Sequence, residues 1–189
     1  MDRRYRKTNE AIRQAYFGML MRREKKITVA EICRRADIDR KTFYLHFDTI
    51  EDIIVLFCRE KMDECMKHME EKGFRDKSYD IKIAFEALND MVEENRELYK
   101  FMASGNDYEY FWDMITQLVS NTLEDVLKEY TIADERERKL YAMFYASATL
   151  SSYRAFLCGE VKFNGEELAE KLAKIAWSGI SGIMKPMND

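Results

Sequence analysis

Proline occurs only once in this chain of 189 residues, as Pro186, and glycine only seven times. Because proline interrupts a helix interior and glycine weakens it, the chain contains few residues that force a helix to end. Apolar residues recur at intervals of three and four along most of the sequence, which is the spacing of an amphipathic helix. These features predict an all-α protein that is long enough to bury a substantial hydrophobic core.

Polar residues that favour helix starts divide this pattern into separate helices. Thr28 with Glu31 matches a capping box, Asp39 can cap the next helix, and Thr49 with Asp52 can cap a long one. Asn164, followed three residues later by a glutamate, gives a similar signal near the end. We expect helices at about 6–23, 28–36, 40–46, 50–71, 81–95, 97–103, 107–129, 134–159 and 165–185.

The first three of these helices are short, and a tight turn separates the second from the third. This layout is typical of a helix-turn-helix motif, which we place at about residues 28–47. We therefore expect an N-terminal three-helix domain over residues 1–50, joined by the long fourth helix to a helical domain over residues 51–189.

Charge is distributed unevenly between these two parts. Residues 1–48 contain thirteen Lys and Arg against seven Asp and Glu, a net charge of +6, whereas the remainder carries −10. A basic N-terminal part on an acidic body indicates that the N-terminal part binds a polyanion. An accident of surface composition is the alternative explanation.

The expected third helix has two different faces. Phe43 and Phe47, four residues apart, lie on one face and must pack on the first two helices. The other face carries groups that suit the major groove of DNA, since cations donate to guanine and hydroxyls hold phosphate. These groups are Arg40, Lys41, Thr42 and Tyr44. A solvated amphipathic helix would show the same pattern, and the basic setting favours the DNA-binding interpretation.

The segment ITVAEICRRADIDRKTFYLHFDTIEDI, residues 27–53, resembles the DNA-binding segment of the TetR family of transcriptional regulators. The residues that match the family pattern are Thr28, Ile32, Ala36, Ile38, Thr42, Phe43, Tyr44, His46, Phe47 and Glu51. The resemblance implies that Thr28, Thr42, Tyr44 and His46 contact phosphate or groove, and that Arg40 and Lys41 read bases. For His46, packing against the first helix is an alternative of similar weight.

Four positions depart from the family pattern. Asp37 replaces the turn glycine and tolerates a left-handed backbone, and Asp39 replaces the usual serine cap. Lys41 replaces a small residue and adds a cation at the groove. Ile50 stands where the family usually has a lysine that binds phosphate, so we expect one backbone contact to be missing.

Small residues in the last two helices predict a dimer interface. A helix-turn-helix domain covers few base pairs, so such proteins generally pair to recognise two half-sites. Two helices from each subunit would form a four-helix interface with twofold symmetry. The residues that we assign to it are Ala148, Ser152, Ala173, Ala176 and Ile180. Packing within one chain is the alternative explanation.

The middle of the chain is rich in Met, Phe, Tyr and Trp, which are adaptable residues that also line ligand cavities. Most of them must form core. In the TetR family a cavity in this region commonly holds an effector, and for its wall we select Phe85, Met102, Trp112 and Tyr145. The helix at 50–71 joins the two domains and is the expected coupling element.

Several classes of function are disfavoured. The two histidines and four cysteines form no metal-ligand cluster, so we expect no metal, no cofactor and reduced cytoplasmic thiols. The sequence contains no phosphate-binding loop and no nucleophile elbow, so we expect no enzyme activity and no catalytic residues. No apolar run is long enough to span a membrane. We therefore expect a dimeric, effector-responsive repressor that binds a palindromic double-stranded DNA operator. The alternative is a TetR-like co-activator or protein-binding module that has lost operator binding.

Overall fold

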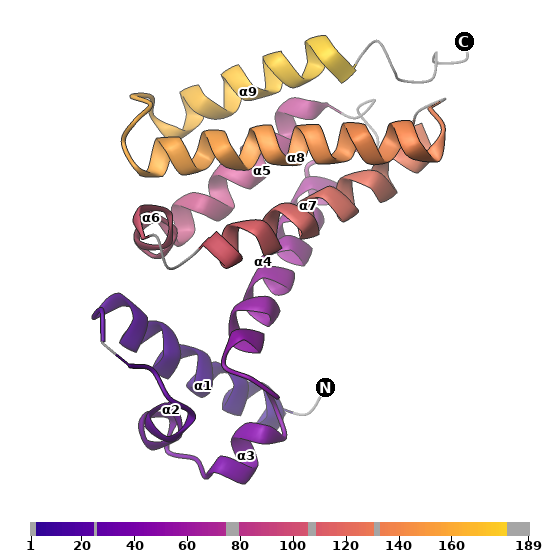
Figure 1. Cartoon of the computed structure of the whole chain (residues 1–189). Coiled ribbons are helices and arrows are strands. Elements are labelled where there is room, and N and C mark those ends of the chain that lie inside the picture. The colour runs from indigo at the N-terminus through magenta and orange to yellow at the C-terminus, as the bar shows by residue number, and fades with distance from the viewer. Residues whose placement is uncertain (1–2, 25, 75–79, 106–108, 131–132, 181–189) are drawn as a thin grey trace. The chain divides into compact units, whose positions relative to one another are not determined.

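The computed structural model of the chain describes residues 3–24, 26–74, 80–105, 109–130 and 133–180. Within these residues the chain forms helices and no strand, as the helical periodicity predicts. The N-terminal helices are α1 (Arg3–Met21), α2 (Val29–Ala36), α3 (Arg40–Tyr44) and α4 (Glu51–Glu71). They are followed by α5 (Ile81–Glu94), α6 (Arg96–Ser104), α7 (Glu109–Tyr130), α8 (Glu135–Leu157) and α9 (Gly165–Ile180) (Figure 1).

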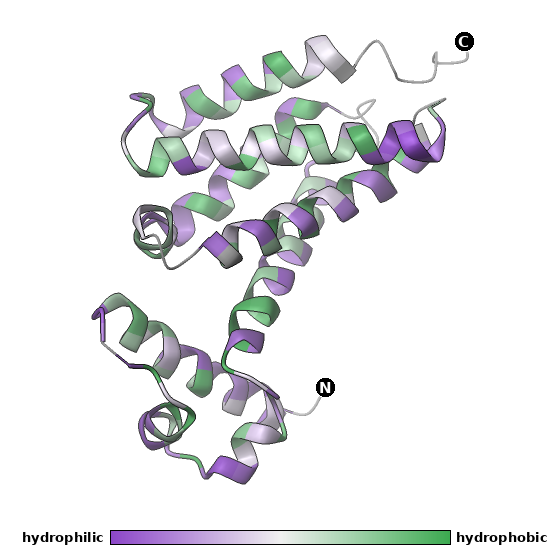
Figure 2. Cartoon of the chain, viewed as in Figure 1, coloured by the Kyte–Doolittle hydropathy of each residue, from purple (hydrophilic) through white to green (hydrophobic). Residues whose placement is uncertain are grey.

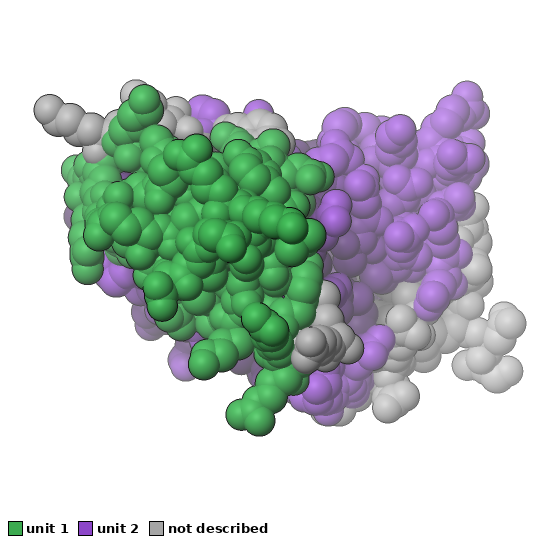
Figure 3. Space-filling model, turned by 90° about the horizontal axis from the view of Figure 1, so that it is seen from below, with its two compact units in different colours: residues 1–58 green, residues 59–189 purple. Residues whose placement is uncertain are grey.

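The chain divides into two compact units, residues 1–58 and 59–189 (Figure 3). The division lies inside α4, eight residues beyond the boundary that the sequence suggested, because the first turns of α4 pack with the N-terminal helices. Ile53 and Phe57 are buried there, and the Phe57 ring meets the Phe17 ring edge-on at 4.9 Å. The start of α4 is thus part of the first unit.

The first unit has a small core built from one side of each helix. Apolar residues at helical spacing on α1 pack over α2, and Phe43 of α3 is completely buried. The side chains in this core include Ile12, Tyr16, Met19, Leu20, Ile32, Phe43 and Phe47. Burial of these residues fixes which face of α3 points outward.

Short polar contacts set the helix starts in both units. Asp39 accepts a hydrogen bond from the Thr42 backbone N–H at 2.6 Å and so begins α3. Thr49 and Asp52 bond reciprocally across the start of α4, at 2.7 and 3.3 Å. Asn164 makes the corresponding reciprocal pair at the start of α9. These three caps follow the sequence signals.

The turn between α2 and α3 depends on Asp37. Its φ of 54° and ψ of 51° are left-handed, and its N–H bonds to the Cys33 carbonyl. Few non-glycine residues adopt this conformation readily, and aspartate is one of them. Asp37 therefore ends α2 and directs the chain into α3, where glycine is usual in the family pattern.

In the second unit α7 packs along α8, α5 packs along α9, and α6 packs against α8. Large side chains fill this core, among them Tyr153, Phe111 and Met102. Figure 2 shows the first turns of α8 as hydrophilic and most of its remaining turns as hydrophobic. None of the helices in the described ranges is both long enough and apolar enough to cross a membrane.

Two helices are shorter than the sequence suggested. α3 ends at Tyr44 rather than near residue 46, and α8 ends at Leu157, where Cys158 and Gly159 close its last turn. The last helix was expected to continue to about residue 185. Residues 181–189 lie outside the described residues, and α9 is described to Ile180.

Candidate nucleic-acid interface and ligand cavity

The third helix separates its core residue from its polar residues. Phe43 has no exposed surface, whereas Tyr44, the next residue, is 54% exposed. Arg40 and Lys41 are exposed and Thr42 is half-buried. Burial of Phe43 and Phe47 therefore presents two cations and a phenol on one outward face of the first unit. Such a face suits DNA, because cations and hydroxyls bind backbone phosphates and cations also donate to guanine in the major groove.

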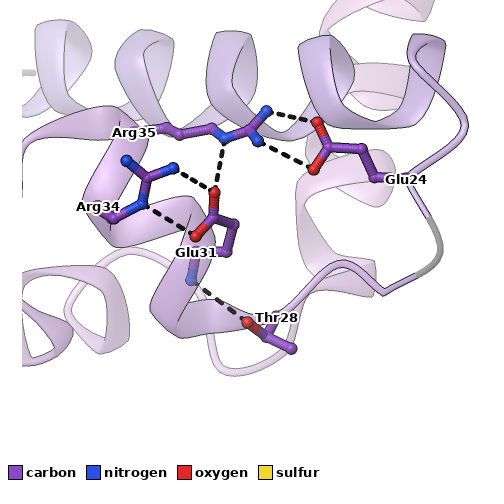
Figure 4. A network of polar contacts seen from close by, with 5 residues as sticks. All are labelled: Glu24, Thr28, Glu31, Arg34 and Arg35. Carbon is purple, nitrogen blue, oxygen red and sulfur yellow. Dashed lines mark hydrogen bonds and ion pairs between the residues drawn. The ribbon is translucent and has the colours of Figure 1, made fainter.

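The start of α2 carries a second set of polar groups. The Thr28 hydroxyl accepts a hydrogen bond from the Glu31 N–H at 3.3 Å, as the capping signal predicts. The Glu31 side chain does not return to Thr28, so the reciprocal half of the capping box is not formed. Instead it binds Arg34 and Arg35, with Nε–Oε distances of 3.0 and 2.9 Å (Figure 4). Charged guanidinium donors outcompete a neutral backbone N–H for a carboxylate.

Arg35 also binds Glu24, with N–O distances of 2.8 and 3.0 Å, and this contact ties α2 to the chain just after the end of α1 (Figure 4). Hydrogen bonds from Arg34 and Arg35 lower the pKa of Glu31 to about 2. Arg35 is thus held by two carboxylates, while most of the Arg34 side chain, 69%, stays exposed. Sequence reasoning missed this network. The sequence signal for it is the position of Glu31 three residues before Arg34 and four before Arg35, a spacing that brings side chains together on a helix.

His46 lies against α1. Its ring stacks on the Tyr5 ring at a centroid distance of 4.1 Å, and Nδ1 forms a hydrogen bond with the Asn9 side chain. Burial lowers the pKa of His46, which favours the neutral ring. This geometry matches the packing alternative for His46, and it leaves Arg40, Lys41 and Tyr44 as the more exposed groups of the expected DNA-binding set.

Ile50, where the family pattern has a lysine, is half-buried just before α4. Its carbonyl accepts a hydrogen bond from the Ile53 N–H at 3.2 Å. The side chain supplies no cation at the start of α4. Any phosphate contact at this position would have to come from other groups, such as the backbone.

The second unit contains a cavity of about 200 Å³. Its wall is formed by side chains of α4, α5, α7, α8 and α9. The residues that α4 and α5 contribute are Met62, Cys65, Met66, Met69, Ile81, Ala84, Phe85 and Leu88. The residues that α7 contributes are Val119, Thr122, Leu123, Val126 and Leu127. The cavity is thus bounded largely by flexible apolar side chains.

Of the four residues selected for a cavity wall, two line this cavity and two lie elsewhere. Phe85 and Tyr145 are on the wall. Trp112 instead donates its indole N–H to the Met102 carbonyl at 3.2 Å, and both residues are buried core. The α4 residues were missed, although their spacing of three and four places them on one helix face. Periodicity alone does not distinguish a cavity wall from solid core.

The residues assigned to a dimer interface have different surroundings. Ala173 and Ala176 are each only 6% exposed, on the side of α9 that packs within the chain. They are therefore inaccessible to a second subunit in this conformation. Their burial agrees with the alternative explanation, in which these small residues pack within one chain. Ala148 is exposed and Ser152 is half-buried on α8, and the side chain of Ile180 lies outside the described residues.

From Leu140 to Tyr153, α8 is uncharged and exposes large apolar side chains on its outward face. Leu140, Phe144 and Ala148 follow at intervals of four, so they share one face. Leu140 is 56% exposed and Phe144 is 63% exposed. Residues 140–153 contain no charged residue. Exposed faces of this composition are typical of interaction surfaces.

The chain matches known proteins through its second unit and through its fold. Residues 80–177 match a family model described as the C-terminal region of a transcriptional regulator. No curated protein sequence matches the chain.

Among solved structures, the dihydroxyacetone kinase operon activator DhaS is 18% identical, with a TM-score of 0.58 over 94% of this chain and 98% of its own. The TetR family repressor AlkX from Dietzia sp. strain DQ12-45-1b is 12% identical, with a TM-score of 0.60 over 93% and 98%. A TetR transcriptional regulator from Streptococcus agalactiae 2603V is 21% identical, with a TM-score of 0.54 over 93% and 96%. At these identities the likeness is one of fold.

Proposed function

Because this chain belongs to the TetR family of transcriptional regulators, we propose that it is a repressor that binds a palindromic DNA operator as a homodimer and releases it in response to a small-molecule effector. The first unit binds DNA, the outward face of α8 pairs the subunits, and the cavity in the second unit holds the effector.

The observation that carries the DNA-binding proposal is the division of α3 into a buried face and a basic exposed face. Phe43 anchors the helix, and Arg40, Lys41 and Tyr44 project from it. The N-terminus of α2 adds backbone N–H groups near Thr28, which suit a phosphate oxygen. A net charge of +6 over residues 1–48 supplies attraction to the backbone at any sequence.

A gel shift at stated salt, with DNA that flanks the gene and with selected random DNA, tests this proposal. We expect a palindromic site, because two subunits related by a twofold axis read two half-sites. Lys41→Ala should relax the base preference by about 1–3 kcal/mol at one position of each half-site. Lys100→Ala removes an exposed cation from α6 in the other unit and serves as the matched control, with unchanged affinity. Unchanged preference in the Lys41 variant would contradict the assigned role.

Dimerisation through α8 is supported by its uncharged outward face. Phe144→Glu would bury a carboxylate between apolar surfaces, so it should shift the protein to monomer in analytical ultracentrifugation. Phe163 is also partly exposed, at 39%, but lies in the α8–α9 connection. Phe163→Glu is therefore the matched control and should leave the mass unchanged. A Phe144 variant that remains dimeric would place the interface elsewhere.

Effector response is supported by the position of α4. This helix passes from the first unit into the second, where Met62, Cys65 and Met66 line the cavity. If DNA also distinguishes two positions of α4, a ligand that binds one of them more tightly lowers the DNA affinity by at most its own difference in affinity. Release of operator DNA on ligand addition, at constant salt, is the expected result.

Ile50 favours a second candidate, a co-activator or protein-binding module of the same fold. The start of α4 lacks the cation that the family pattern has there, and the body is acidic. If no flanking, genomic or random DNA fragment is retarded at low salt, this second candidate replaces the first.

A further inference from the structure

The first two turns of α1 carry a dense group of cations. Those that are exposed are Arg3, Arg4, Arg6 and Lys7. No acidic residue lies in the first described turn of the helix. The N-terminus of a helix is the positive end of its dipole, so acids would stabilise α1 there and cations weaken it. Residues that oppose the local structure in this way are typical of a binding surface.

Three of these cations are available to an anionic partner. Within the part of the chain that the structure describes, Arg3, Arg6 and Lys7 form no ion pair. Glu10, the next acid along α1, is bonded to Arg13 instead, with 3.1 Å between Arg13 Nε and Glu10 Oε2. We name Arg3, Arg6 and Lys7 the α1 basic cluster.

The α1 basic cluster is held next to the end of α3. Tyr5, in the same turns of α1, stacks on the His46 ring at a centroid distance of 4.1 Å, and the Asn9 side chain bonds to His46 Nδ1. His46 lies two residues beyond the end of α3, so the start of α1 is beside that end (Figure 1). A duplex bound to α3 carries one phosphate on each strand every 3.4 Å, and these phosphates continue past the end of the helix.

We propose that the α1 basic cluster binds phosphates of the DNA backbone in addition to those at α2 and α3, and so supplies anchorage that Ile50 does not. The proposal rests on the proposed DNA binding of the first unit and names a further part of the protein that contacts DNA. Arginine and lysine hold phosphate without reading a base. The contact therefore raises the affinity for every DNA sequence and leaves the base preference unchanged.

The first experiment measures the affinity of the full chain for operator DNA at several salt concentrations. Each cation that neutralises a phosphate releases counterions, so the plot of log K against log salt loses about 0.9 of its slope for each contact removed. The α1 variant replaces the cluster by glutamine: Arg3→Gln, Arg6→Gln and Lys7→Gln. We expect its slope to be shallower by at least about 0.9 for each bound subunit. An unchanged slope would overturn the proposal.

A matched control removes the same charge from exposed lysines of the second unit. Its substitutions are Lys100→Gln, Lys139→Gln and Lys162→Gln. We expect a slope near that of the wild type, and equal losses in the two variants would show that only net charge matters. Melting curves establish that both variants are folded, and the α1 variant should melt no lower than the wild type, because the cations removed oppose the helix dipole. If it does not fold, the three single substitutions replace it, and at least one must lower the slope.

The second experiment locates the phosphates. Methylphosphonate groups replace single phosphates of the operator and remove their charge. At the phosphates beside the cluster, each replacement should weaken wild-type binding about two- to fivefold, the size of an exposed ion pair, and should not affect the α1 variant. Tyr5→Ala keeps the cations but removes the stacking on His46, so it should lose the same sensitivity, whereas Tyr5→Phe should retain it. A scan in which no phosphate distinguishes the wild type from the α1 variant would contradict the contact.

The outcomes separate this proposal from the proposed function. If the wild-type chain binds no DNA, both are wrong. If it binds DNA and the α1 variant and the control bind alike, the cluster is not a contact and the proposed function stands. If the α1 variant changes the base preference, the cluster reads bases and its assignment to phosphate is wrong.

Discussion

Replacing Thr28 by alanine removes the only side-chain cap observed at the start of α2. In the wild-type chain the Thr28 hydroxyl accepts a hydrogen bond from the Glu31 N–H at 3.3 Å. The backbone N–H groups of Val29 and Ala30 lie just beyond it, at the positive end of the helix dipole, where a phosphate oxygen can bind. Loss of the cap should fray the first turn and disperse these donors.

The size of the effect follows from the geometry. Loss of an N-cap side chain typically costs about 0.5–2 kcal/mol. Here the bond is long, and Glu31 makes no returning bond because it is held by Arg34 and Arg35. We therefore expect about 0.5–1 kcal/mol, at the lower end of the range. A loss of this size in DNA binding corresponds to a decrease of about two- to fivefold in affinity.

Denaturant unfolding and gel shifts at one fixed salt concentration test this prediction, with Thr28→Ser as the matched control that keeps the hydroxyl. The alanine variant should weaken binding to all DNA sequences by the same factor, since phosphate contacts carry no base information. A change in sequence preference, or equal losses in the serine and alanine variants, would show that Thr28 does not act as a cap beside phosphate.

Three further substitutions test the core, the charge network and the cavity wall. Phe43→Ala removes a fully buried ring and should destabilise the first unit by about 3–5 kcal/mol in denaturant unfolding, whereas Tyr44→Ala, at the exposed neighbour, should change stability by less than about 0.5 kcal/mol. The pKa of Glu31 is about 2 in the folded chain against 4.5 ordinarily, so the folded state binds fewer protons and the stabilisation is complete above pH 4.5. It is lost as the pH falls from about 4.5 to 2, and Glu31→Gln should remove this part of the acid unfolding curve. In Gly179→Ala the new Cβ would lie 2.2 Å from the Tyr145 hydroxyl oxygen, so the Tyr145 ring must move. This overpacking should lower the free energy of unfolding by about 1–3 kcal/mol. Because the ring also lines the cavity, calorimetry should show weaker ligand binding. Unaltered ligand affinity would separate Tyr145 from the binding site.

Much of the first unit could be predicted because its structure depends on contacts close in sequence. Asp39 caps α3 three residues on, Thr49 and Asp52 bond to each other, and Asp37 makes the turn. The spacing of Phe43 and Phe47 likewise decides which residues of α3 face outward. Such features require only local geometry and helix periodicity, which the sequence displays directly.

The side chain of Glu31 shows where local reasoning fails even at short range. The capping box predicts that it returns to Thr28, but two arginines within one turn compete for the same carboxylate, and Arg35 is in addition oriented by Glu24. Sequence spacing shows that each contact is possible. Which contact forms depends on the relative strength of charged and neutral donors in the folded arrangement.

By itself the amino-acid sequence determined that this chain is helical, that a helix-turn-helix lies near residues 28–47, and that α3 has one apolar and one basic face. Helix spacing, capping and charge are properties of neighbouring residues, and they need no knowledge of the remaining fold. Tertiary structure alone decided that Phe85 and Tyr145 share a cavity while Met102 and Trp112 do not. It also decided that Ala173 is buried within the chain while Phe144 is exposed. Apolar side chains at helical spacing look alike in sequence, and only the packing of distant helices against one another determines which are buried, line a space or remain exposed.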